Sequence, residues 1–173
     1  PAEDRSWLEQ WWPAVEPGAR AEVGLPRDRA WAALVAAAEG SVLLAVDYAH
    51  QAGSRPSTGT LIGYQRGQAV VPIPDGSCDV TAHVAIDAVA AAGEAAGATG
   101  TVLTTQRAAL LCLGVSGEPP GTSSARVDPA GYLRALQLAG EAAELLDPSG
   151  LGAFAWLVQT RGPQLPVGLA RTD

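Results

Sequence analysis

Residues 75–84, Asp-Gly-Ser-Cys-Asp-Val-Thr-Ala-His-Val, bring carboxyl, hydroxyl, thiol and imidazole side chains close together in the chain. If the stretch is a strand, Asp79, Thr81 and His83 face one side and apolar side chains face the other, because side chains alternate along a strand. A carboxylate, a hydroxyl and an imidazole on one face can bind a polar ligand and accept a proton. The pattern is therefore typical of one wall of a binding pocket.

A purely structural interpretation fits the same residues. Asp75-Gly76 is a common turn signal, and Asp79 can cap a helix that begins at Val80. A histidine beside an aspartate is also more often a structural hydrogen-bonded pair than a catalytic one. The local pattern leaves both interpretations open.

The rest of the chain alternates predicted helices and strands, which indicates an α/β fold. Helices are expected over residues 3–12, 26–39, 87–96, 106–113 and 130–146, and strands over 42–46, 60–64, 69–73, 79–84, 101–104 and 151–160. The apolar run 42–46 is typical of a fully covered parallel strand. Asp47 follows it, at the end of the strand where open α/β sheets bind ligands.

Shorter signals refine these elements. Arg66-Gly67 predicts the turn of a hairpin between two short strands. Asp87 is expected to cap the helix that follows it, and Asp128-Pro129 is a cap and first-turn pair for the long helix. Within helix 26–39, Trp31, Leu34, Val35 and Ala38 are expected to face inward.

The first helix carries an unusual cluster of tryptophans. Trp7, Leu8, Trp11 and Trp12 share one side of it. They either pack against residues that precede this sequence in a longer chain or form an exposed surface for a partner. Packing is the favoured interpretation.

Five blocks in register carry a family resemblance. They are Ser41–Ala49 ending in Asp47-Tyr48-Ala49, Gly59–Tyr64, Pro74–Val84, Thr105-Gln106 with Leu110 and Leu113-Gly114, and Trp156–Gln159. In this order and spacing they resemble the C-terminal half of the MidA-like S-adenosylmethionine-dependent methyltransferases. That family includes the mitochondrial complex I assembly factor that methylates an arginine. The resemblance extends over residues 7–159.

The resemblance implies a fold and a cofactor. Residues 1–162 would form the C-terminal portion of a Rossmann-like, seven-stranded methyltransferase sheet with extended insertions, and 163–173 a tail. The cofactor would be S-adenosyl-L-methionine, bound mainly by an N-terminal half, because no glycine-rich turn follows a strand in this sequence. We therefore expect the chain to be one piece of a larger polypeptide. The implied partners are that N-terminal half, a protein substrate such as a complex I subunit, and a second copy in a homodimer.

The resemblance also assigns roles to residues. An arginine acceptor presents a planar fork of donors that a carboxylate can bind at two points. Asp79 is the first candidate for that carboxylate and Asp47 the second. His83 would take the proton that is lost, and Thr81 would position the substrate. Further residues expected near the substrate or cofactor are Tyr48, Thr60 and Gln106.

Departures from the family pattern support a second hypothesis. Many members have arginine where this chain has Ile62, and histidine where it has Gly67. If the missing side chains contacted substrate or cofactor, the chain is instead a non-catalytic interaction or assembly module, with its tryptophan-rich start as the partner surface.

Composition excludes other classes of protein. The formal net charge of −7 and the scattered arginines argue against binding to nucleic acid. No apolar run is long enough to span a membrane, so a cytoplasmic location is expected. Two cysteines, Cys78 and Cys112, form no disulfide framework, and His50 and His83 alone make a poor zinc site, so no metal is expected.

Overall fold

The computed structural model describes residues 1–13, 16–166 and 168–169 of the 173-residue chain. Its helices are α1 (Ala2–Trp11), α2 (Leu25–Ala37), α3 (Ile86–Ala95), α4 (Gln106–Cys112), α5 (Ser124–Val127) and α6 (Pro129–Leu145), with short 3-10 turns at Ala52–Ser54 and Leu151–Ala153. Its strands are β1 (Ser41–Asp47), β2 (Ala49–His50), β3 (Ile62–Gln65), β4 (Gln68–Val70), β5 (Asp79–Thr81), β6 (Val84–Ala85), β7 (Gly100–Thr105) and β8 (Ala155–Arg161). The predicted α/β class is confirmed, and the five predicted helices are all present.

The main sheet has three strands in the order β1-β8-β7. Strand β8 is antiparallel to both neighbours, so β1 and β7 run in the same direction. The described residues form sheets of three, two and three strands, and no seven-stranded sheet occurs among them. Within these residues one edge of β1 is unpaired.

The prediction of a fully covered parallel strand at 42–46 is wrong. Strand β1 pairs antiparallel with β8, and the alternating residues Val42, Leu44 and Val46 are 48%, 49% and 41% exposed. The composition of the strand could not predict this exposure. Whether an apolar side chain is covered depends on which element packs on its face of the sheet.

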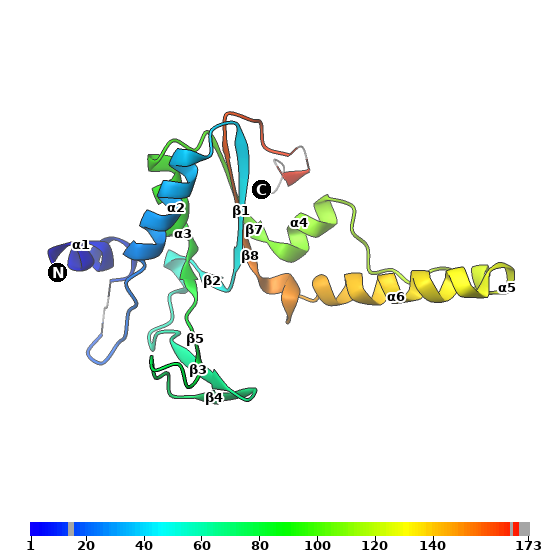
Figure 1. The fold of residues 1–173 in the computed structure, drawn as a ribbon, viewed down its shortest axis with the longest axis horizontal. Helices are drawn as coiled ribbons and strands as arrows, with labels where there is room; N and C mark the ends of the chain where they lie inside the picture. The colour runs from blue at the N-terminus through cyan, green and yellow to red at the C-terminus, as the bar shows by residue number, and fades with distance from the viewer. Residues whose placement is uncertain (14–15, 167, 170–173) are drawn as a thin grey trace.

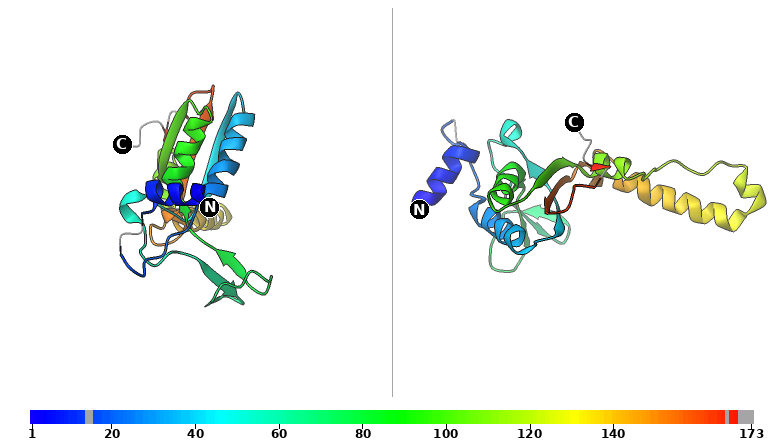
Figure 2. Two further views of the ribbon diagram at one scale, coloured as in Figure 1. Left: turned by 90° about the vertical axis from the view of Figure 1, so that its left-hand side faces the viewer. Right: turned by 90° about the horizontal axis from the view of Figure 1, so that it is seen from above.

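Helices α2 and α3 lie side by side against the sheet (Figures 1 and 2). The core beneath them consists of Val84, Ile86, Val89, Ala90 and Leu157, with Trp31 packed against it. On α2, Val35 is fully buried as predicted, whereas Leu34 is 57% exposed. The predicted inward stripe of this helix is therefore narrower than expected.

The tryptophans of α1 pack within the chain. Trp7 and Trp12 are buried in a cluster with Ala85 and Ala88 of the β6–α3 segment. The Trp7 indole Nε1 donates a hydrogen bond to Asp28 Oδ2 at 2.6 Å. The prediction that these side chains are packed is confirmed for Trp7 and Trp12, but their partners are α2 and the β6–α3 segment of this chain rather than upstream residues.

Strands β3, β4 and β5 form a small ribbon beside the main body (Figure 1). The predicted hairpin is confirmed: its turn has positive φ angles at Arg66 (52°) and Gly67 (76°), as a tight two-residue hairpin turn requires. The predicted continuous strand 79–84 is wrong. It breaks after Thr81, because β5 pairs with β3 while β6 pairs with β2.

Two further details concern the helix ends and the last residues. Asp128 caps α6 as predicted, with Oδ1 accepting the Gly131 N–H at 2.9 Å. Asp87 does not cap α3, because Ala85 occupies that position and Asp87 lies in the first turn. Of the expected tail, 163–166 and 168–169 are described, and Leu165 and Leu169 pack on the outer face of the sheet.

Candidate active site at the end of strand β1

An aromatic cluster follows the carboxyl end of β1. The Tyr48 ring stacks on the His83 imidazole with centroids 5.6 Å apart, and its other contact is an edge-on approach to Phe154 at 4.4 Å. Tyr48 is still 52% exposed, and Asp47 beside it accepts the Tyr48 N–H through Oδ1 at 2.8 Å. A partly exposed aromatic ring next to a carboxylate is a suitable surface for a cation.

The loop under this cluster is fixed by Glu22. Its carboxylate accepts the backbone N–H groups of Thr60 and Leu61 at 2.5 and 2.7 Å and the Thr60 hydroxyl at 2.6 Å. The Thr60 Oγ1 in turn accepts the His83 N–H at 2.8 Å. Burial alone raises the pKa of Glu22, but the hydrogen bonds from Thr60 and Leu61 outweigh it and hold that pKa below its usual value.

Arg55 connects three segments that are distant in sequence. Its guanidinium donates to the Trp11 carbonyl at 2.9 Å, to the His50 carbonyl at 2.8 Å and to Asp87 Oδ1 at 2.5 Å. The side chain is only 7% exposed, and Asp87 is 20% exposed. Asp87 Oδ2 also accepts the Ala52 N–H at 2.9 Å, so this buried ion pair holds α1, the segment after β2 and the start of α3 together.

Arg55 also determines the state of His50. Its Nη1 lies 2.6 Å from His50 Nδ1, and because a guanidinium can only donate, Nδ1 must be the accepting nitrogen. Burial lowers the pKa of His50, and the adjacent Arg55 charge lowers it further. His50 is therefore neutral with its proton on Nε2, a buried atom that has no partner among the described residues.

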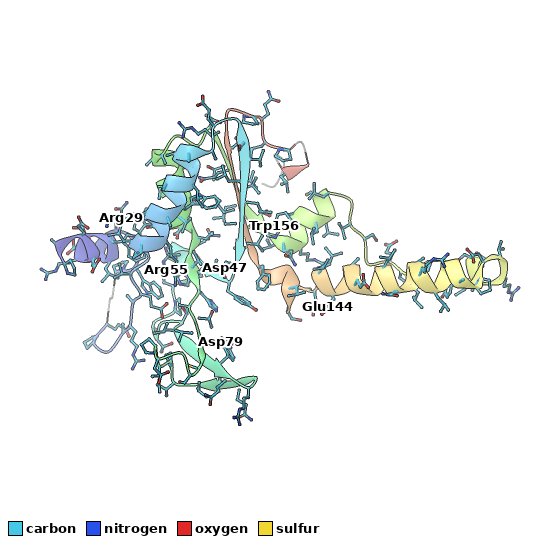
Figure 3. All side chains as sticks on the ribbon, in the orientation of Figure 1. Arg29, Asp47, Arg55, Asp79, Glu144 and Trp156 are labelled. Atoms are coloured by element: carbon cyan, nitrogen blue, oxygen red, sulfur yellow. The ribbon has the colours of Figure 1, made fainter. Side chains whose placement is uncertain are left out.

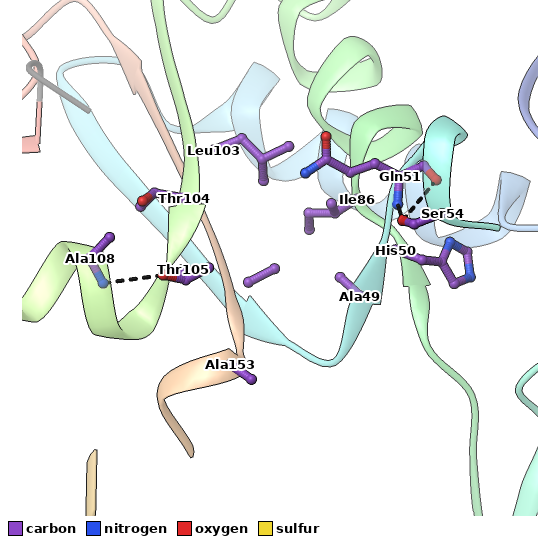
Figure 4. Close-up of a pocket in the computed structure, with 11 residues that line it drawn as sticks. Ala49, His50, Gln51, Ser54, Ile86, Leu103, Thr104, Thr105, Ala108 and Ala153 are labelled. Carbon is purple, nitrogen blue, oxygen red and sulfur yellow. Dashed lines mark hydrogen bonds between the residues drawn. The ribbon is translucent and has the colours of Figure 1, made fainter. Parts of the chain in front are cut away.

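Two cavities meet at His50. The sheet-end cavity, of about 690 Å³, lies at the carboxyl ends of β1 and β7 and is lined by Ile86, Leu103, Thr105 and several alanines (Figure 4). The His83 groove, of about 520 Å³, is lined by Thr60, Tyr64 and His83. Both include His50 in their walls.

The predicted site residues fall into separate places. Tyr48, His83 and Thr60 come together around the His83 groove, with Asp47 adjacent in sequence to Tyr48. Asp79 and Thr81 lie instead on the ribbon, opposite Tyr64 and Ile62 of β3. Figure 3 shows Asp47 at the end of β1 and Asp79 on the ribbon. The break in the strand separates the row that alternation predicted on one face.

Gln106 lies apart from both groups. It is buried at the start of α4, where Nε2 donates to the Leu145 carbonyl at 3.1 Å and Oε1 accepts the Trp156 indole at 3.3 Å. Both ends of its amide are thus used to join α6 and β8 to α4, as the structural interpretation of a buried glutamine requires.

Sequence reasoning missed Glu22 and Arg55 and gave His50 and Asp87 minor roles. Glu22 carries no local signal, because its partners Thr60 and Leu61 are far along the chain. Arg55 stands in a polar loop where arginine is ordinarily exposed. These residues matter only through long-range contacts.

Within the described residues, no three His, Cys, Asp or Glu side chains gather in a way that could hold a metal ion. Among the same residues, no helix combines the length and the apolar character needed to cross a bilayer.

Comparison with known proteins places the chain in a family. Residues 1–104 match the family described as "Putative S-adenosyl-L-methionine-dependent methyltransferase", and the chain belongs to that family. No curated protein matches the chain.

Two solved structures from Burkholderia thailandensis, both of one superfamily, share the fold. The first, a "likely methyl transferase" bound to S-adenosyl-homocysteine, has a TM-score of 0.79 at 22% identity, over 100% of this chain and 45% of that one. The second, uncharacterized, has a TM-score of 0.67 at 25% identity, over 83% of this chain and 39% of that one. The chain thus spans less than half of either relative.

The described residues do not fit S-adenosylmethionine as a whole. A strand-end carboxylate for the ribose hydroxyls and a glycine-rich turn into a helix are the usual requirements of such nucleotide sites. Strand β1 here leads into β2 rather than into a helix, and no glycine-rich turn into a helix follows a strand among the described residues. We therefore assign no cofactor contacts to individual residues of this chain.

Proposed function

We propose that this chain is the acceptor-binding part of an S-adenosylmethionine-dependent methyltransferase whose acceptor is an arginine side chain of a protein. The supporting observation is the Tyr48–His83 stack beside Asp47, at the carboxyl end of β1 and within the segment that matches the family. A guanidinium is planar and cationic, so it can lie on the exposed Tyr48 ring while a carboxylate binds its edge.

The carboxylate in this proposal is Asp79, with Asp47 as the competing candidate. Asp47 Oδ1 is occupied by the Tyr48 N–H, which leaves Oδ2 for a ligand. Asp79 is exposed on the ribbon strand and pairs with Tyr64, whose side chain lines the His83 groove. In both versions the His83 imidazole takes the proton that the nitrogen loses on gaining a methyl group, and Thr81 positions the substrate.

The cofactor would be bound mainly by an N-terminal half of the same enzyme, corresponding to the part of the solved relatives that this chain does not cover. Two observations support this: the edge of β1 leaves backbone groups without a strand partner, and the exposed Val42, Leu44 and Val46 need another element packed on their face of the sheet. Pairing there would extend the three strands into the seven-stranded sheet of a Rossmann-like methyltransferase.

The MidA-like resemblance supplies the finer proposals. Under it the substrate is a subunit of respiratory complex I and the enzyme acts in the cytoplasm. The acidic net charge of −7 is compatible with attraction of a basic arginine-containing segment.

The test uses the full-length protein with labelled S-adenosylmethionine and arginine-containing peptides from complex I subunits. Tyr48→Ala and either Asp79→Asn or Asp47→Asn should each lower the methylation rate by about 100-fold or more, because each removes a contact to the acceptor. Asp75→Asn is the matched control, since Asp75 is an exposed carboxylate four residues before Asp79, and its Oδ1 accepts the Ser77 N–H within its own loop. Full activity in both Asp79→Asn and Asp47→Asn would refute the carboxylate assignment.

The alternative is a non-catalytic assembly module. It is favoured by the position of Asp79 and Thr81 outside both cavities, and by Ile62 and Gly67 at positions where the MidA-like resemblance implies arginine and histidine. Calorimetric titration of S-adenosylmethionine into the full-length protein separates the two functions. Absence of binding there would favour the module and refute the enzyme.

A further inference from the structure

One wall of the His83 groove belongs to the ribbon of strands β3, β4 and β5. Ile62 and Tyr64 of β3 line the groove. In the antiparallel register, Thr81 of β5 pairs with Ile62, and Asp79 pairs with Tyr64. Because paired residues of antiparallel strands place their side chains on the same face, Thr81 and Asp79 lie on the face that forms the groove wall. The wall therefore continues past the cavity onto β5.

Two exposed tyrosines, each with an exposed carboxylate beside it, adjoin this groove. Tyr48 is 52% exposed, follows Asp47 in the chain and stacks on His83, a residue of the groove wall. Tyr64 is 43% exposed and lies opposite the exposed Asp79 on the ribbon. We refer to Tyr48 with Asp47 as the strand-end pair and to Tyr64 with Asp79 as the ribbon pair. Figure 3 labels the two carboxylates.

Both pairs can bind a cationic side chain. A tyrosine ring attracts a cation to its face, and a carboxylate accepts hydrogen bonds from a guanidinium or an ammonium group. Among the described residues, neither Asp47 nor Asp79 has an ion-pair partner. Each pair can therefore hold one cation from another molecule, and the groove joins the two positions.

The character of the ribbon face indicates what kind of partner covers it. The face presents the phenol of Tyr64, the hydroxyl of Thr81 and the carboxylate of Asp79. Permanent interfaces are more apolar than this, whereas partners that bind and leave meet mixed polar surfaces. The negative charge of the face favours a basic partner. A protein substrate with its arginine on the strand-end pair has its flanking residues beside this face, because the groove connects the two.

We propose that the protein substrate carries a second basic side chain near the methylated arginine, and that the ribbon pair binds this second side chain. The methylated arginine then lies on the strand-end pair, with Asp47 as its carboxylate, next to the His83 imidazole. This inference rests on the proposed function in its Asp47 version and specifies the substrate as a segment with two basic residues. Tyr64 and Asp79 act in substrate binding and not in the transfer of the methyl group.

Binding of labelled synthetic peptides to the full-length protein, followed by fluorescence anisotropy, tests the ribbon pair without requiring methylation. One set of peptides has a second arginine at successive positions on either side of the first. In a matched set, that second arginine is replaced by citrulline, which is neutral and similar in shape. At the best spacing, the two-arginine peptide should bind about tenfold more tightly than its citrulline counterpart, because it gains a cation–π contact and an exposed ion pair.

Variants assign that gain to named side chains. Tyr64→Ala and Asp79→Asn should each weaken binding of the best two-arginine peptide about threefold, and the double variant about tenfold, with no change for the citrulline peptide. Val80→Ala and Asp75→Asn are the matched controls and should not change either affinity. Val80 lies on the opposite face of β5, because side chains alternate along a strand, and Asp75 is an exposed carboxylate that accepts the Ser77 N–H in its own loop.

Methylation kinetics with the same peptides separate this inference from the proposed function. Loss of the ribbon pair should raise KM for the two-arginine peptide about tenfold and leave kcat unchanged, because the contact is the same in the bound substrate and in the transition state. Equal binding of the two-arginine and citrulline peptides would overturn the inference, and a ribbon face covered by another part of the polypeptide or by a second copy would give that result. The proposed function would stand if methylation persisted. Binding that depends on the ribbon pair, without methylation, would refute the function and keep the site for a dibasic segment.

Discussion

The buried ion pair of Arg55 gives the sharpest stability prediction. Replacing Arg55 by methionine keeps the apolar stem but leaves the Asp87 carboxylate without its cation and leaves the carbonyls of Trp11 and His50 without a donor. Breaking a buried pair by removing one partner costs about 3–5 kcal/mol. At a urea m-value of about 2 kcal/mol per molar, a loss of this size lowers the unfolding midpoint by about 2 M.

The assay is urea unfolding followed by tryptophan fluorescence, with Arg29→Met as the matched control. Arg29 forms an ion pair of similar length with Glu3, at 2.7 Å, but the two side chains are 64% and 67% exposed. Exposed pairs contribute less than about 1 kcal/mol, so this midpoint should move by less than about 0.5 M. Equal midpoint shifts in the two variants would refute the inference that burial makes the Arg55 pair important.

Three further predictions concern buried or strained groups. Burial raises the pKa of Asp28 despite the Trp7 hydrogen bond, so the folded state holds the carboxyl proton up to a higher pH than the unfolded state does. The free energy of unfolding should therefore fall as the pH rises above about 4. Asp28→Asn should flatten this fall in thermal unfolding scans at about pH 4–8. The pKa of Glu22 is lowered, so its contribution is present above about pH 4.5 and is lost on acidification. Glu22→Gln should cost about 1–2 kcal/mol at pH 7 and much less at pH 3, and equal losses would contradict the assignment. Gly59 has a φ of +74°, and a Cβ there would lie 2.7 Å from Glu22 Oε1. Gly59→Ala should therefore destabilise the folded protein by at least about 1–2 kcal/mol. An unchanged unfolding midpoint would show that the Thr60 loop adapts freely.

Local elements were the most predictable part of this protein. The Asp128-Pro129 pair begins α6, and Arg66-Gly67 turns the β3–β4 hairpin, because capping and positive φ depend on residues adjacent in sequence. The coverage of a strand was not predictable in the same way. Val42–Val46 reads as a buried run, but its exposure depends on which elements pack beside it.

The candidate site was likewise predictable only where it depends on local sequence. Alternation correctly marked strand residues at 79–81 and 84, yet it could not show that the segment changes sheets after Thr81, since the pairing partners β2 and β3 are set by tertiary contacts. As a result His83 joins Tyr48 while Asp79 stays on the ribbon. Methylation by the Asp79→Asn and Asp47→Asn variants distinguishes the two carboxylates.

The sequence by itself determined the α/β class, the positions of most helices and strands, and a resemblance to methyltransferases, because these follow from local patterns and ordered motifs. Only the tertiary structure showed the buried Arg55–Asp87 pair, the fixed tautomer of His50 and the Glu22 carboxylate under the Thr60 loop. Each of these joins residues more than thirty positions apart or depends on burial, and burial is a property of the packed chain rather than of any short segment of it.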